Sequence, residues 1–191
     1  MQRIDLFPTP VAVFDVPNHE IIDARIMHYA SDTTYNFRKF RDVWELRSED
    51  KEIDILYNVF LIFASQYVNS ILGTEYTYKN FKHQHGWINT QNPGLVGRVH
   101  DHGGVSIAAT YYVNVNESSG TINLADPRAG VSAWLRPGDM FDNVSHSKSI
   151  YKWKPSIGKI IMIPGWLLHN VDINESNEVR VSVSTNIQLV V

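Results

Sequence analysis

The chain contains no cysteine. This absence excludes disulfides, thiolate nucleophiles and zinc–thiolate sites, and leaves His, Asp and Glu as the strong candidates for metal ligands. A large excess of positive or negative charge is also absent, because the net charge is −3 and no run of lysine and arginine occurs. We therefore expect no nucleic-acid partner.

Long hydrophobic runs are missing as well. The first ten residues contain Arg3, Asp5 and two prolines, with no apolar segment of the signal-peptide type, and no later stretch is expected to reach the length of a membrane span. These absences predict an intracellular, cytoplasmic protein with no membrane partner.

The size and composition favour one domain. With 191 residues, of which 43% are hydrophobic, the chain can form one well-packed core and is short for two. We expect a single domain over residues 1–191, divided into a strand plus helical buttress over 1–73 and a β core over 74–191.

The first part of the chain predicts a strand and two helices. Leu6–Val16, with two early prolines, is typical of a strand at a sheet edge. A short helix is expected from His19 to about Ala30. A longer helix is expected from an N-cap at Ser48 to Gly73, because its apolar residues recur at helical spacing and would pack on a sheet.

After Gly73 the chain turns to short segments rich in Val, Ile, Tyr and Thr, separated by turn residues. The candidate strands are Tyr76–Asn89, Arg98–His102, Ser106–Val115, Gly120–Leu124, Met140–Asn143, Gly158–Ile163, His169–Ile173 and Val179–Val190. The pattern predicts a mainly β protein with N-terminal helices: a double-stranded β-helix, or cupin-like jelly roll, buttressed by α-helices.

Two nearby histidines are the first candidates for a metal site. In an extended strand, residues i and i+2 share a face, so His100 and His102 can direct two imidazoles at one point. His169, on a distant strand, could add a third ligand and leave positions open for a substrate and O2. Each histidine could equally be a half-buried surface residue with one hydrogen bond.

A rival pair has the same spacing, because His83 and His85 also lie two residues apart. Periodicity does not separate the two pairs. The glycines at 103 and 104 favour the later pair, since they permit a bulge or a tight bend beside the ligands.

The C-terminal strand carries a candidate anion site. From Val179 to Asn186, apolar residues alternate with Arg180, Ser182, Ser184 and Asn186, so one face belongs to the core and the other is polar. An inward-facing arginine is costly unless an anion pairs with it. A carboxylate ligand at Arg180 is one interpretation, and a structural salt bridge or a solvent-facing row is the other.

In combination, His-x-His, Pro-Gly-Trp-x-x-His and Arg-x-Ser resemble the Fe(II)- and 2-oxoglutarate-dependent oxygenases, whose double-stranded β-helix carries His-x-Asp, a distal His and Arg-x-Ser. A small family of 2-oxoglutarate-Fe(II) oxygenases of bacteria and phages is similar over nearly the whole chain. The matching segments are Leu6–Pro10, Trp87–Asn89, His100–His102, Tyr111–Val113, Asp126–Arg128 and Arg180–Ser182.

The resemblance implies specific residue roles. His100 and His169 would be iron ligands, and Arg180 and Ser182 would hold the distal carboxylate of 2-oxoglutarate. At position 102 this chain has His where the superfamily has a carboxylate. His102 is the favoured second ligand, and Asp101 is an alternative that only a bulge would bring into place. Candidates for the pocket wall are Trp87, Asn89, Tyr112 and Trp166, of which Asn89 and Tyr112 would also contact the cofactor.

The function implied is that of a dioxygenase, an oxidoreductase using Fe(II), 2-oxoglutarate and O2. It would hydroxylate a C–H bond of a prolyl, asparaginyl or aspartyl side chain in a peptide or protein, or of a free amino acid or small molecule. The alternatives are a cupin-like metal enzyme that does not use 2-oxoglutarate and a non-catalytic jelly-roll module. A phage origin would place the protein in the host cytoplasm, and the oligomeric state, homodimer included, stays open.

Overall fold

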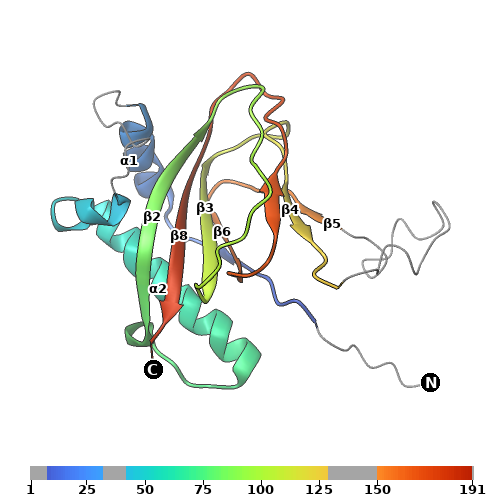
Figure 1. Ribbon diagram of the computed structural model, residues 1–191. Coiled ribbons are helices and arrows are strands. Elements are labelled where there is room, and N and C mark those ends of the chain that lie inside the picture. The colour runs from blue at the N-terminus through green and yellow to red at the C-terminus, as the bar shows by residue number, and fades with distance from the viewer. Residues whose placement is uncertain (1–7, 32–41, 129–149, 191) are drawn as a thin grey trace.

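Two antiparallel β-sheets face each other in the computed structural model, which describes residues 8–31, 42–128 and 150–190 (Figure 1). The major sheet has the strand order β1-β6-β3-β8-β2, and the minor sheet has the order β5-β4-β7. The strands are β1 (Ala12–Asp15), β2 (Phe81–Gln91), β3 (Ile107–Asn114), β4 (Ile122–Ala125), β5 (Ile150–Trp153), β6 (Lys159–Pro164), β7 (His169–Val171) and β8 (Arg180–Leu189). This is the predicted jelly roll. The expected strand Met140–Asn143 lies outside the described residues.

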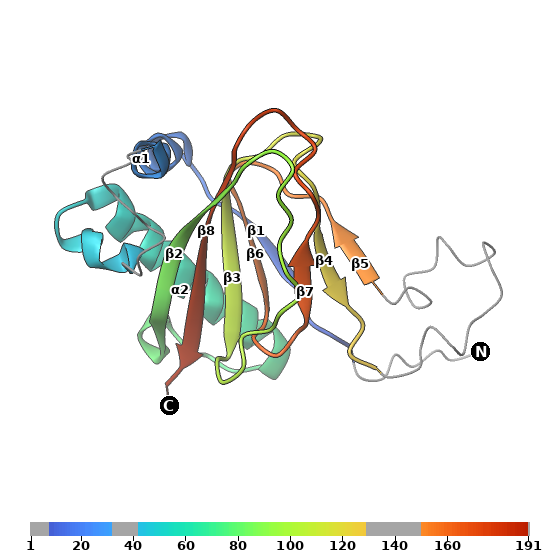
Figure 2. The same ribbon diagram turned by 45° about the horizontal axis from the view of Figure 1, so that its top comes forward.

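The helices cover the outer face of the major sheet, as the two views agree (Figures 1 and 2). They are α1 (Glu20–Ser31), α2 (Lys51–Leu72) and the short 3-10 helices η2 (Val43–Ser48) and η3 (Tyr78–Asn80). A large apolar core fills the space between helices and sheet. The helical buttress is therefore present as predicted, and β1 joins it to the sheet at the edge position that its prolines indicated.

The N-cap of α2 differs from the prediction. Ser48 ends η2, and Asp50 caps α2 instead, because its side chain accepts a hydrogen bond from the backbone nitrogen of Ile53. Asp50 also accepts hydrogen bonds from Tyr29 and Arg25 of α1. The start of α2 is thus set by a contact between two helices. Gly73 ends α2 in the left-handed conformation.

Helix α2 also corrects the expectation about membrane spans. Among the described residues, α2 is a helix that is both long enough and apolar enough to cross a membrane, judged by length and composition alone. The core helix of a soluble protein passes the same test, and Ile53, Leu56 and Phe60 of α2 are buried against the sheet. The helix therefore gives only weak support for a membrane span.

A second, smaller core lies between the two sheets. Alternation along β8 distributes its side chains: Val181 and Val183 belong to the core under the helices, whereas Arg180 and Ser182 come from the intervening positions, which face the other way. The polar row predicted on β8 thus faces the inter-sheet space, where the candidate site must be sought.

The expected strand Arg98–His102 is wrong as a regular strand. His100 forms an isolated bridge with His169, and the residues around it have no ladder. The reason is an inserted residue. Backbone hydrogen bonds join Gly97 to Val171 and His100 to His169, so the chain advances by three residues from 97 to 100 while β7 advances by only two. The sequence also does not predict β5, because its side chains are mostly exposed and do not alternate.

Candidate metal centre

Three histidines converge in the inter-sheet space. One ring nitrogen each of His100, His102 and His169 lies within 4.8 Å of the others, which is close enough for one metal ion. Backbone bonds hold the group: His100 and His169 exchange two N–H···O bonds of 2.9 Å, and the His102 nitrogen donates to the Gly165 carbonyl at 2.8 Å. The irregular segment is thus fixed against the start of β7 and the turn that follows β6.

The proton positions on two of these rings follow from their partners. His100 Nδ1 lies 2.8 Å from the carbonyl oxygen of Arg98, and His169 Nδ1 lies 2.8 Å from that of Leu167. Because a carbonyl oxygen only accepts, each Nδ1 carries a proton, and in the neutral ring Nε2 then has the free lone pair. This is the hydrogen-bond pattern of metal-ligating histidines.

Burial favours the neutral form of His102 and His169. Desolvation lowers the pKa of His102 to about 4, with further lowering from His169 and His100, and it also lowers the pKa of His169. His169 is buried and His102 is half-buried, whereas His100 is exposed. Neutral imidazole is the ligating form, so at neutral pH His102 and His169 can bind a divalent metal without first losing protons.

Asp101 does not join the group, although it stands between two of its members. Its carboxylate accepts a hydrogen bond from the Gly103 backbone nitrogen at 3.1 Å and is exposed to solvent. The geometry therefore offers His102, and not Asp101, beside His100. The assignment of ligands remains a proposal.

The rival pair is split by a β-bulge between His83 and His85. His83 is directed under the helices, where its ring nitrogens contact the carbonyl of Tyr57 and the hydroxyl of Thr185. His85 stacks on Trp87 at a centroid distance of 5.5 Å. The inserted residue thus places the two rings in different surroundings, and they cannot share an ion.

Arg180, on the β8 face that is turned toward the inter-sheet space, is only 4% exposed and forms no ion pair with any described residue. Its Nη1 donates to the Ser119 carbonyl at 3.3 Å, and its guanidinium lies over the ring of Tyr112, 5.3 Å from the centroid. Burial lowers the pKa of Arg180. An unneutralised buried cation is the arrangement expected of an anion-binding site.

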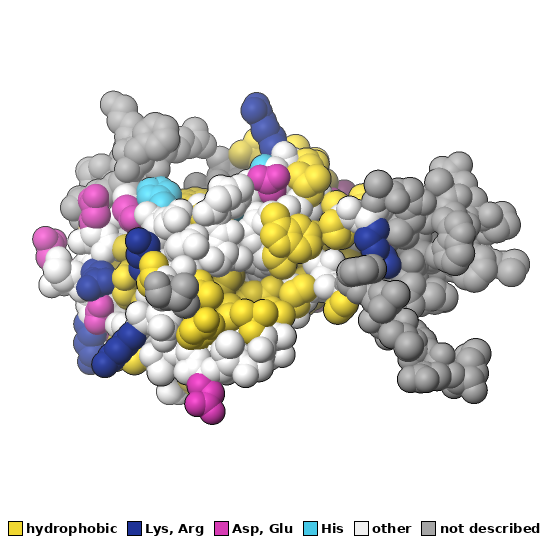
Figure 3. Space-filling model, turned by 60° about the horizontal axis from the view of Figure 1, so that its bottom comes forward, with side chains coloured by type: hydrophobic (Ala, Val, Ile, Leu, Met, Phe, Trp, Pro, Cys, Tyr) yellow, Lys and Arg dark blue, Asp and Glu magenta, His cyan; other side chains and the backbone are white. Residues whose placement is uncertain are grey.

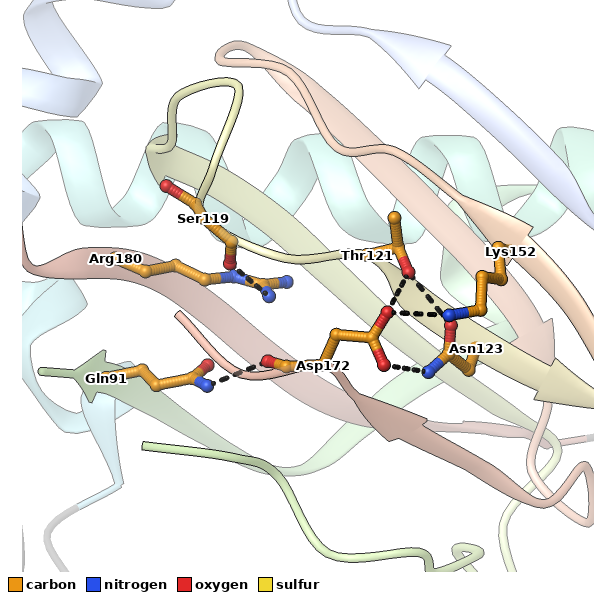
Figure 4. Close-up of polar contacts among 7 residues, drawn as sticks. All are labelled: Gln91, Ser119, Thr121, Asn123, Lys152, Asp172 and Arg180. Atoms are coloured by element: carbon orange, nitrogen blue, oxygen red, sulfur yellow. Dashed lines mark hydrogen bonds and ion pairs between the residues drawn. The ribbon is translucent and has the colours of Figure 1, made fainter. Parts of the chain in front are cut away.

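The carboxylate whose charge acts on Arg180 is bound elsewhere (Figure 4). Asp172 accepts hydrogen bonds from Thr121 at 2.7 Å and Asn123 at 2.6 Å, and forms an ion pair with Lys152 at 3.1 Å. Three donors therefore satisfy Asp172, and the guanidinium keeps its capacity to bind another carboxylate.

A cavity lies beside the histidines. Its lining includes His102, His169 and Trp87, with Thr110 and Ser184 from the facing strands. Ser184 bonds to Thr110 at 2.9 Å and accepts from Asn89 at 2.9 Å. These two hydroxyls were not among the predicted site residues. The alternation on β8 could have indicated Ser184, whereas Thr110 stands in an apolar strand without a comparable signal.

The remaining predicted residues do not line this cavity. Ser182 and Asn89 form a contact of 3.5 Å behind Ser184. Tyr112 is fully buried beneath Arg180, and burial raises its pKa to about 12 although the positive charge of Arg180 acts in the opposite direction. Trp166 is 53% exposed and belongs to the surface. Of the four expected wall residues, only Trp87 is in the lining.

The donor set fits a divalent transition metal. Three imidazole nitrogens suit Fe, Zn, Cu and Ni, and three protein ligands leave room for further ones. His100, His102 and His169 could hold the ion, and Arg180 is the group suited to the far carboxylate of a dicarboxylic acid.

Comparisons with known proteins agree with this geometry. A family model described as "Putative 2OG-Fe(II) oxygenase" matches residues 85–186, more than half of the chain. The matched range contains the three histidines and Arg180. The comparison with curated proteins gave no match.

Solved structures share the fold at low sequence identity. A prolyl-4-hydroxylase from Pseudomonas putida is 13% identical with a TM-score of 0.60, and 94% of this chain covers 88% of it. AviO1 from Streptomyces viridochromogenes is 11% identical with a TM-score of 0.62, at 94% and 90% coverage. HygX from Streptomyces hygroscopicus, solved with nickel and 2-oxoglutarate bound, is 11% identical with a TM-score of 0.58, at 94% and 82% coverage.

The match over residues 85–186 decides between the interpretations that the sequence left open. It supports an oxidoreductase that uses Fe(II), 2-oxoglutarate and O2 over a cupin-like enzyme without the cosubstrate and over a non-catalytic module. The chain belongs to the 2OG-Fe(II) oxygenases.

Proposed function

We propose that this oxygenase hydroxylates a C–H bond in a prolyl, asparaginyl or aspartyl side chain of a peptide or protein, with a free amino acid as the alternative substrate. The observation that carries the proposal is the convergence of three histidines beside a cavity, with His100 exposed to solvent. The overall reaction converts substrate C–H, O2 and 2-oxoglutarate into substrate C–OH, succinate and CO2.

The roles of the residues follow from their chemistry. His100, His102 and His169 would hold Fe(II), which supplies the oxidative chemistry when it is bound with 2-oxoglutarate and O2. Arg180 would bind the distal carboxylate of 2-oxoglutarate, and Ser182, two residues along the same strand face, would add a hydrogen bond. A neutral ligand set leaves the positive charge of the ion uncompensated, which favours an anionic cosubstrate beside it.

The rim of the site supports a peptide substrate. His100 is exposed, and its neighbour Val99 and the neighbour of His169, Leu168, are 67% and 46% exposed. On the face shown in Figure 3, patches of hydrophobic side chains lie among polar ones, and charged groups lie mainly toward the margins. Exposed apolar side chains next to the histidines suit an extended chain better than a small, highly charged metabolite.

The structural neighbours point to both classes of substrate. One is a prolyl-4-hydroxylase, whereas a carbocyclase related at 12% identity, with a TM-score of 0.59, comes from nogalamycin biosynthesis. At such identities only the fold is shared, so the preference for a peptide substrate in this proposal rests on the exposed apolar side chains beside the histidines.

The test is a product analysis. Protein loaded anaerobically with Fe(II) is mixed with 2-oxoglutarate, peptides containing proline, asparagine or aspartate, and air, and the products are analysed by mass spectrometry and for succinate. We expect a peptide heavier by one oxygen atom and an equal amount of succinate, both abolished by Arg180→Met and retained by Arg47→Met, an exposed arginine. Oxidation of free amino acids alone would refute the peptide proposal, and oxidation independent of 2-oxoglutarate would refute the role of the cosubstrate.

A further inference from the structure

The three histidines are not oriented in the same way. His100 and His169 each donate Nδ1–H to the carbonyl two residues earlier, Arg98 and Leu167, at 2.8 Å. Within residues 8–31, 42–128 and 150–190, the His102 side chain has no such hydrogen bond. Its ring instead stacks on two others, Trp87 at a centroid distance of 6.0 Å and an interplanar angle of 28° and His169 at 5.2 Å and 15°, and meets the His100 ring in an edge contact at 5.0 Å.

The backbone of His102 is held by its hydrogen bond to Gly165, but this bond does not orient the imidazole. The chain then turns at Gly103 and Gly104, where Gly104 has a φ of 86°. An imidazole on such a segment can turn about its side-chain torsions unless something holds its face. A ring in contact with that face is the remaining restraint.

Trp87 is itself firmly placed. Its indole N–H donates to Asn89 Oδ1 at 3.0 Å, and Asn89 Nδ2 donates to Ser184 Oγ at 2.9 Å on the paired strand. Trp87 is opposite Ser184 in the ladder between β2 and β8, and His85 packs on its ring at 5.5 Å and 20°. The indole is therefore a rigid surface that belongs to the sheet rather than to the irregular segment.

We propose that Trp87 is a positioning residue for His102, whose imidazole it holds by face-to-face contact at the angle that directs a nitrogen toward the shared ion. Contact with this ring replaces the hydrogen bond that orients the other two histidines. The inference rests on the proposed metal site. It assigns to Trp87 a role in metal binding, in addition to its place in the cavity wall.

The experiment compares metal binding in Trp87→Leu, Trp87→Phe and Trp166→Leu with the wild type. Anaerobic titration with Co(II), followed by its visible absorption, gives affinity and the coordination spectrum without turnover. We expect Trp87→Leu to weaken Co(II) binding by about tenfold to a hundredfold, the range for loss of an outer-shell partner, and to alter the spectrum. Trp87→Phe keeps an aromatic face and should restore most of the affinity. Trp166→Leu, an exposed tryptophan without a ring contact to His102, should match the wild type.

A double-mutant cycle separates positioning from general loosening of the fold. In a His102→Ala background the indole has no imidazole to hold, so adding Trp87→Leu should not lower Co(II) affinity further. Urea unfolding of the metal-free variants checks that each is folded. The proposal is overturned if Trp87→Leu binds Co(II) like the wild type, or if its effect persists without His102. Failure of the wild type to bind Co(II) would instead overturn the metal site and this inference together.

Discussion

Replacing Arg180 by methionine should separate a binding role from a structural one. The guanidinium is buried, donates to the Ser119 carbonyl and lies over the ring of Tyr112, while Asp172 is satisfied by its own three donors. A structural ion pair at this position would require an acidic partner, and none is present among the described residues.

The magnitudes follow from this arrangement. Removing one partner of a buried ion pair lowers stability by about 3–5 kcal/mol. Replacing a buried charge that has no ionic partner by an apolar side chain of similar volume should instead leave stability unchanged or raise it. We therefore expect the free energy of unfolding of the metal-free protein to fall by no more than about 1 kcal/mol, the value of one hydrogen bond, or to rise. The loss of a charged contact to 2-oxoglutarate costs about 2–5 kcal/mol, which weakens its binding from about thirtyfold to a few thousandfold.

Two assays on the same preparations test this reasoning. Urea unfolding of the metal-free protein gives stability, and anaerobic titration of the Fe(II)-loaded protein with 2-oxoglutarate gives affinity through the visible charge-transfer band. Arg180→Lys keeps the charge but not the planar fork, so its affinity should be intermediate. A loss of several kcal/mol in stability with unchanged 2-oxoglutarate affinity would refute the account of Arg180.

Three further predictions concern the fold. Burial lowers the pKa of His83 to about 4, so as the pH falls the unfolded chain takes up this proton before the folded one does, and the folded protein loses stability between about pH 6.5 and pH 4. His83→Phe should reduce the pH slope of the unfolding free energy in this range by up to about 1.4 kcal/mol per pH unit, whereas an unchanged slope would count against the role of His83. Gly86→Ala would place a Cβ 2.1 Å from Trp44 Nε1, and urea unfolding should show a loss of about 1–3 kcal/mol rather than none. Asp50→Ala removes the N-cap bond to Ile53 and the link to α1, and the same assay should show a loss of about 2–4 kcal/mol, whereas a loss below 0.5 kcal/mol would contradict the capping role.

The fold and much of the site could be predicted from patterns that depend on local chemistry. Alternation along β8 placed Arg180 and Ser182 on one face, and helical spacing located the buried face of α2. The glycines at 103 and 104 favoured the later histidine pair, but the separation of His83 from His85 could not be predicted, because it comes from a bulge and bulges depend on pairing with another strand.

The irregular segment around His100 was beyond sequence reasoning for the same kind of reason. This segment departs from a regular strand because it has one residue more than the part of β7 that it pairs with, and this difference is visible only once the pairing is known. The position of Thr110 in the cavity wall likewise depends on its register opposite Ser184. Local patterns thus predicted which residues share a face, and the long-range register determined which of them meet.

The central claim is that His100, His102 and His169 bind one ion beside which 2-oxoglutarate is held. Its most direct test is the anaerobic titration of the protein with Fe(II) at saturating 2-oxoglutarate, followed by the visible charge-transfer band. The account predicts a band that saturates at one equivalent of Fe(II), is lost in the alanine variant of each of these histidines, and is retained in Asp101→Ala. A band that survives His102→Ala but disappears in Asp101→Ala, or no band in the wild type, would contradict it.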